Sequence, residues 1–88
     1  RWMNQQPRII ILNDPTAAVD VGSRREIHRR LREAAAQGMS VVIITSDLEE
    51  VEQVCDRAVV IRAGKVAADL RDNHVNINEM TRYAYEAA

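Results

Sequence analysis

The chain is poor in the residues that build disulfide-stapled, aromatic-rich or membrane-spanning proteins. It has one cysteine, one tryptophan, two tyrosines and no phenylalanine. A single cysteine, Cys55, excludes an intrachain disulfide and is typical of a reducing compartment. No apolar run approaches the ~20 residues that a membrane-spanning helix needs, and no apolar segment typical of a secretory signal opens the sequence. Because 47% of the residues are hydrophobic, the core must be aliphatic.

An excess of charge of one sign is also missing. Twelve basic and thirteen acidic residues leave a net charge of −1, which gives no electrostatic reason to expect nucleic acid as a partner. With 88 residues the chain is at most one small domain, with a limited core. It begins with Arg1 rather than methionine, so we expect a fragment or a processed piece of a longer protein.

What the sequence does contain is a series of β-branched runs. Residues 9–12 and 40–45 are continuous apolar or β-branched stretches, typical of parallel strands buried on both faces. A third strand is predicted at residues 58–61. The turn after it and the alternating stretch at 65–70 predict a hairpin. Helical spacing and a capping-box pattern predict a first helix at about 23–37, starting at a Ser23 cap and ending at Gly38.

Two shorter helices complete the pattern, one after Ser46 as its cap and one capped near Asn76. The order β-α-β-α-β-β-α predicts an α/β fold whose sheet is parallel and ends in a β-hairpin and a C-terminal helix. Three parallel strands with so few helices leave one sheet face and at least one edge bare. We therefore expect part of a larger sheet.

Polar residues follow both of the first two predicted strands. Asn13 and Asp14 end the first, before Pro15, and Thr45 and Ser46 end the second. In open α/β sheets ligands bind at this edge, where a carboxylate can hold Mg²⁺ or orient a water and a hydroxyl can bond a phosphate. Structural roles compete with this interpretation: a simple polar strand end and, for Ser46, a helix cap.

Other candidate residues favour structural roles. Asp20 fits an Asx-turn better than chemistry. His28 lies among arginines and is expected on a solvated helix face, where Glu26 and Glu33 are interleaved with the basic residues. No GxxxxGK[ST] loop is present, so nothing in this sequence can cradle the β-phosphate of a nucleotide.

Taken in order, these segments resemble the ATP-binding subunits of ABC transporters, most closely the bacterial sugar-import branch with two nucleotide-binding halves in one chain. Residues 9–16, ending Asn-Asp-Pro-Thr, are similar to the Walker B segment, and residues 17–22 to the D-loop. Residues 43–51 are similar to the switch region and residues 55–66 to the closing hairpin. Residues 1–3 resemble the end of the helix after the signature motif. The resemblance implies a partial P-loop NTPase-like fold, with residues 1–88 forming a single incomplete domain of the second half.

The resemblance also implies roles for four residues. Asn13 stands at the position of the Mg²⁺-ligating Walker B aspartate, and Asp14 at that of the general-base glutamate. Ser46 replaces the switch histidine, and Asp20 is the D-loop aspartate that faces the cofactor and a second subunit. Three of these positions depart from the family pattern, which implies a weakened metal and catalytic site.

For the intact parent the resemblance implies ATP and Mg²⁺ as cofactors. It implies as partners the remainder of the nucleotide-binding subunit, a second nucleotide-binding half and transmembrane permease subunits. The location implied is cytoplasmic and peripheral, on the inner face of the cell membrane. The Walker A, Q-loop and signature segments would precede Arg1, so we expect the fragment alone to bind no cofactor, to hydrolyse no ATP and to self-associate.

Two alternatives stay open. In one, the segment serves as a catalytically silent half that mediates subunit interaction and dimerisation. In the other, it is a receiver-type phospho-acceptor domain. Thr45 and Ser46 would match the Thr/Ser end of a receiver strand, and Lys65 its downstream lysine. The receiver interpretation needs an acidic pair on an earlier strand and a longer chain, and this sequence has neither.

Overall fold

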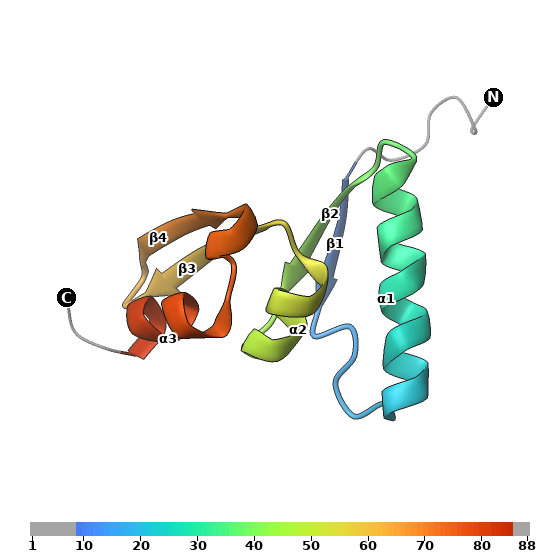
Figure 1. Cartoon of the computed structure of the whole chain (residues 1–88), viewed down its shortest axis with the longest axis horizontal. Coiled ribbons are helices and arrows are strands. Elements are labelled where there is room, and N and C mark those ends of the chain that lie inside the picture. Colours follow the sequence, from blue (N-terminus) through green and yellow to red (C-terminus); the bar gives the residue numbers. More distant parts are fainter. Residues whose placement is uncertain (1–8, 86–88) are drawn as a thin grey trace. The chain divides into compact units, whose positions relative to one another are not determined.

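A computed structural model describes residues 9–85, so the prediction for residues 1–3 lies outside the described part. The chain divides into two compact units, Arg1–Ser46 and Asp47–Ala88, and each is considered by itself (Figure 1). The predicted order of strands and helices is confirmed, with one short 3₁₀ helix added. The elements are β1 (Ile9–Asn13), α1 (Val21–Ala36), β2 (Ser40–Ile44), α2 (Leu48–Val54), β3 (Arg57–Arg62), β4 (Lys65–Arg71), η2 (Asp72–His74) and α3 (Ile77–Tyr85).

The first unit is a strand–helix–strand unit. Its strands β1 and β2 pair in parallel, from Ile9 opposite Ser40 to Asn13 opposite Ile44, and α1 connects them (Figure 1). Parallel neighbours need such a crossover because their like ends lie at the same edge of the sheet. The predicted βαβ arrangement of these elements is therefore confirmed.

The two faces of this small sheet differ in exposure. Ile9, Ile11, Val42 and Ile44 alternate along the strands on one face and are 44–65% exposed. The residues between them are half-buried, and α1 packs against the sheet. The expectation that each strand is buried on both faces is wrong for the described residues, because α1 can cover only one face. The expectation of one bare sheet face is confirmed.

The ends of α1 are fixed by side-chain and backbone hydrogen bonds. The N-cap is Asp20, whose Oδ1 accepts the Ser23 N–H at 2.8 Å, so the prediction of Ser23 as the cap is wrong. At the other end Gly38 has φ +97°, and the N–H groups of Gly38 and Met39 donate to the carbonyls of Ala35 and Ala34. This is the predicted glycine C-cap, in the Schellman form.

The expected exposure of His28 to solvent is wrong. Rather than lying on the solvated face of α1, it is only 8% exposed. It stands three residues before Leu31 and four after half-buried Arg24, spacings that place all three on one side of a helix. The buried side of α1 is thus wider than its apolar residues alone indicate.

The second unit is built on an antiparallel hairpin. Strands β3 and β4 pair with each other, from Arg57 opposite Arg71 to Arg62 opposite Lys65. Within the described residues β3 does not extend the parallel sheet, so the predicted third parallel strand is wrong. The turn residues Ala63 and Gly64 both have positive φ, as a two-residue type I′ turn requires. The predicted turn is therefore confirmed.

Helix α3 closes the core of this unit. Asn76 Oδ1 accepts the Glu79 N–H at 2.8 Å, which confirms the predicted cap. Met80, 1% exposed, packs with the inward-facing residues of the hairpin, and Leu48 and Val51 of α2 pack against the same cluster. The buried hydrophobic residues are Ala58, Val60, Leu70, Val75 and Met80.

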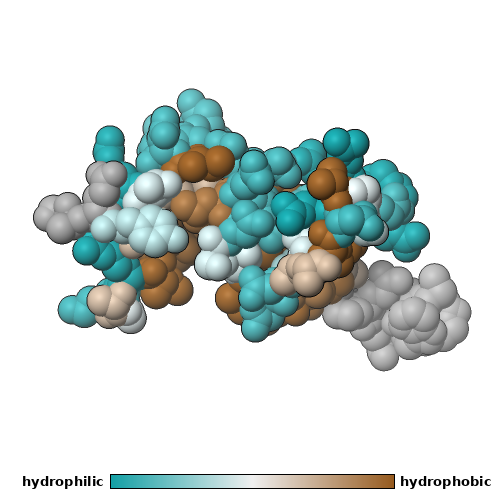
Figure 2. Space-filling model, turned by 90° about the horizontal axis from the view of Figure 1, so that it is seen from below, coloured by the Kyte–Doolittle hydropathy of each residue, from teal (hydrophilic) through white to brown (hydrophobic). Residues whose placement is uncertain are grey.

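The surface of a chain this small carries many apolar side chains. Figure 2 shows hydrophobic residues reaching the surface between hydrophilic ones. Among residues 9–85, no helix combines the length and the apolar character needed to cross a membrane.

Candidate functional site

The candidate site lies at the carboxyl edge of the β1–β2 sheet, within the first unit. Because β1 and β2 are adjacent and parallel, Asn13 and Asp14 end one strand beside Thr45 and Ser46, which follow the other. The Asp14 N–H donates to the Ile44 carbonyl at 2.8 Å and continues the ladder one residue past β1. The structure thus brings Asn13, Asp14 and Ser46 to one edge, as the sequence predicted.

Asp14 begins a tight turn at this edge. Its backbone is left-handed, with φ +49°, and its carbonyl accepts the Ala17 N–H at 3.2 Å. Thr16, inside the turn, is 2% exposed. Within residues 9–85 the Asp14 carboxylate has no hydrogen-bond or ion-pair partner, and its side chain is exposed. It is therefore open to solvent and available to a ligand.

Ser46 is not the cap of α2. Asp47 is the N-cap, and its carboxylate accepts the N–H groups of Glu49 at 3.1 Å and Glu50 at 3.3 Å. The prediction of Ser46 as the cap is therefore wrong. The reason is physical: aspartate and serine cap equally well, and here the extended backbone of residue 47 occupies the cap position. Ser46 therefore has no capping role that competes with ligand binding, and the residue is exposed.

Asp20 has a structural role. Its carboxylate caps α1, and hydrogen bonds from Ser23, the backbone N–H first, lower the pKa of the Asp20 carboxyl. Capping places negative charge at the positive end of the helix dipole, so the ionised form is the one that fits. A side chain used in this way fixes the end of the loop from β1.

The donor set at this edge is incomplete for a magnesium–nucleotide site. Asp14 is its single carboxylate, and Asn13 offers only a neutral amide. The described part of the chain holds no group of three or more His, Cys, Asp or Glu side chains placed to bind a metal ion. Mg²⁺ in nucleotide enzymes binds one or two carboxylates together with waters and phosphate oxygens. These residues therefore do not fit a free-standing site.

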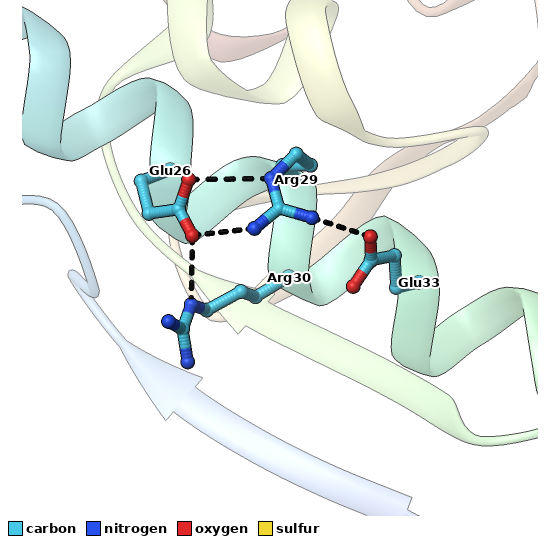
Figure 3. A network of polar contacts seen from close by, with 4 residues as sticks. All are labelled: Glu26, Arg29, Arg30 and Glu33. Carbon is cyan, nitrogen blue, oxygen red and sulfur yellow. Dashed lines mark hydrogen bonds and ion pairs between the residues drawn. The ribbon is translucent and has the colours of Figure 1, made fainter.

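The arginine-rich face of α1 is a network of exposed ion pairs (Figure 3). Glu26 accepts from Arg29 Nε at 3.2 Å and from Arg30 Nε at 3.0 Å, and Arg29 also pairs with Glu33. Hydrogen bonds from Arg29 and then Arg30 lower the pKa of the Glu26 carboxyl to about 2. The carboxylates offset these arginine charges, which confirms the prediction of a solvated, charge-paired face.

Comparison with known proteins gives a consistent result, although no family model matches the chain. It is 42% identical over 84 residues to the ribose import ATP-binding protein RbsA of Hahella chejuensis. It is 40% identical to RbsA of Geobacillus kaustophilus and 34% identical to RbsA of Roseobacter denitrificans. Each match covers 96% of this chain but only 16–17% of the relative's own length. The chain therefore belongs to the family of sugar-import ATP-binding proteins of ABC transporters, as a segment of about one sixth of such a protein.

Proposed function

We propose that this segment supplies one edge of the site at which the ATP-binding subunit of a sugar importer binds and hydrolyses ATP. The observation that carries the proposal is the joint strand edge, where an exposed carboxylate and an exposed hydroxyl flank the Asp14–Ile44 backbone hydrogen bond. The names of the relatives, ribose import ATP-binding proteins, support ATP as the nucleotide and a sugar as the cargo.

Each site residue has a role in this proposal. Asp14 orients the attacking water and accepts its proton, the task of a general base within hydrogen-bond reach. Ser46 donates a hydrogen bond to a phosphate oxygen. Asn13 takes the position of a metal ligand but contributes no charge, which weakens the site. Asp20 acts indirectly, because its cap fixes where the turn from Asp14 meets α1.

Mg²⁺, when bound, would screen the negative charge of the phosphates. Residues beyond this segment must supply the phosphate cradle and the remaining metal ligands, because the edge holds a single carboxylate. The proposal therefore assigns the intact parent, and not this segment alone, as the ATPase. The parent would act with a second nucleotide-binding half and permease subunits on the cytoplasmic face of the membrane.

A second candidate function, a silent interaction half, is favoured by a separate observation. The face of the β1–β2 sheet away from α1 exposes Ile9, Ile11, Val42 and Ile44. A contiguous apolar surface of this kind marks a protein-interaction site or a surface normally covered. In the parent, the remainder of the subunit would cover it.

The first test is Mg-ATP titration into the chain by calorimetry. No heat of binding is expected, because the phosphate cradle is not among these residues. Micromolar binding would contradict the proposal, since the edge would then form a site by itself. Adenosine serves as the control ligand, because it tests whether any heat depends on the phosphates.

The second test separates catalysis from a silent role. Residues 9–85 replace the matching segment of the Hahella chejuensis relative, and ATP hydrolysis by the chimera is measured with and without Asp14→Asn. Loss of a general base lowers the rate about 10²- to 10⁴-fold. The control is Ser40→Ala, an exposed serine at the opposite end of β2, which should leave the rate unchanged. An unchanged rate with Asp14→Asn would favour the silent half.

A further inference from the structure

The backbone of Asp14 is unusual in two respects. Its φ of +49° lies in the left-handed region, which non-glycine residues rarely occupy and which aspartate and asparagine tolerate best. It also precedes Pro15, a position where sterics favour an extended conformation. Backbone outliers of this kind persist only where the surrounding structure holds them, and they cluster at functional sites.

Two backbone hydrogen bonds hold this conformation. On one side the Asp14 N–H donates to Ile44 of β2, and on the other the Asp14 carbonyl accepts the Ala17 N–H. The first bond ties residue 14 to the sheet and the second closes the turn. The carboxylate adds no bond of its own within residues 9–85, so the main chain sets its direction.

We infer that this clamped left-handed backbone selects the acid at the site, making residue 14 a position that requires aspartate rather than glutamate. A residue with left-handed backbone projects its side chain in a different direction from an extended one. The side-chain length needed to reach the substrate therefore differs as well. Aspartate tolerates the conformation and keeps a carboxylate. Asparagine tolerates it without the charge, and glutamate carries the charge but lacks the tolerance. The expected effect on ATP hydrolysis rests on the proposed function, whereas the expected effect on unfolding does not.

The first arm of the test measures unfolding of the 88-residue chain by chemical denaturation. Asp14→Ala and Asp14→Glu are expected to raise the unfolding equilibrium constant about 5- to 30-fold, the range for a left-handed residue without this tolerance. Asp14→Asn is expected to leave it within about twofold. The control is Asp56→Ala, which removes an exposed aspartate outside the left-handed region.

Equal unfolding constants for Asp14→Asn and Asp14→Ala would overturn the inference, as would failure of the Asp14→Asn chain to fold. Failure of the Asp14→Ala or Asp14→Glu chain to fold, with Asp14→Asn folded, would support it.

The second arm measures kcat and KM of the same variants in the chimera. Asp14→Glu is expected to lower kcat about 10- to 100-fold with little change in KM, as for a displaced catalytic group. A glutamate variant as fast as the aspartate protein would overturn the inference. Unchanged hydrolysis with Asp14→Asn would instead refute the proposed catalytic role, while the unfolding data still decide the backbone claim.

Discussion

Replacing Met80 by alanine should unfold the second unit and leave the first unit folded. Met80 is 1% exposed and contacts the small apolar cluster that includes Val60, Leu70 and Val75. Truncation of a buried methionine to alanine costs about 2–5 kcal/mol, because apolar contacts are lost and a cavity remains. At roughly 0.05–0.15 kcal/mol per residue, a whole chain of 88 residues has only about 4–13 kcal/mol of stability. The cost is therefore comparable with all the stability that one unit can have.

The assay is amide hydrogen exchange, resolved by residue. With Met80→Ala, protection should be lost in β3 and β4 but retained by the Asp14 amide, which is bonded to Ile44 in the first unit. Ile61→Ala is the control, because Ile61 is 67% exposed on the same hairpin and its truncation should change the free energy of unfolding by less than about 0.5 kcal/mol. Equal loss of protection in both units would refute the argument that Met80 stabilises the second unit alone. So would a destabilisation as small as that of the control.

Two further predictions concern surfaces of the first unit. The pKa of Glu26 is lowered to about 2 in the folded chain, so its stabilising effect is complete above the unfolded pKa of about 4.3 and is lost as the pH falls towards 2. Helix content measured by circular dichroism should fall over that interval, and less so in Glu26→Gln; identical profiles would contradict this. The exposed apolar sheet face predicts a dimer or higher oligomer in light scattering, and Ile11→Lys with Ile44→Lys should shift the chain towards monomer. A sharp monomer of the unaltered chain at high concentration would contradict that prediction.

The sequence was most informative where local pattern alone decides the structure. The runs around Ile11 and Val42 predicted strands because β-branched residues favour extended backbone, and Gly38 predicted a helix end because it tolerates positive φ. Pairing was harder to predict. The parallel sheet was expected to include β3, but Ala63 and Gly64 allow a tight turn that lets β3 pair with β4 instead. Nothing in the apolar pattern of β3 distinguishes these two partners.

Two of the predicted N-caps were wrong, one by three residues and one by a single residue, for a common reason. Ser23 and Ser46 each begin a capping-box pattern, yet Asp20 and Asp47 occupy the caps. Serine and aspartate cap with similar energy, so the sequence offers competing positions and the backbone path decides between them. His28 was misplaced because a helix stripe read from apolar residues alone omits a polar residue that shares the buried side.

For the candidate site, the positions of the residues could be predicted from the sequence, but the backbone conformation of Asp14 could not. The meeting of Asn13, Asp14 and Ser46 at one edge followed from strand order, because adjacent parallel strands end side by side. The left-handed backbone of Asp14 did not follow, since its position before Pro15 favoured an extended conformation. Yet that conformation decides how to interpret the side chain of Asp14, which is one methylene shorter than that of glutamate. An extended backbone would make Asp14 simply a shortened glutamate, whereas a clamped left-handed one makes aspartate the acid that fits. The same substitution therefore indicates decay of the site in the first case and adaptation in the second.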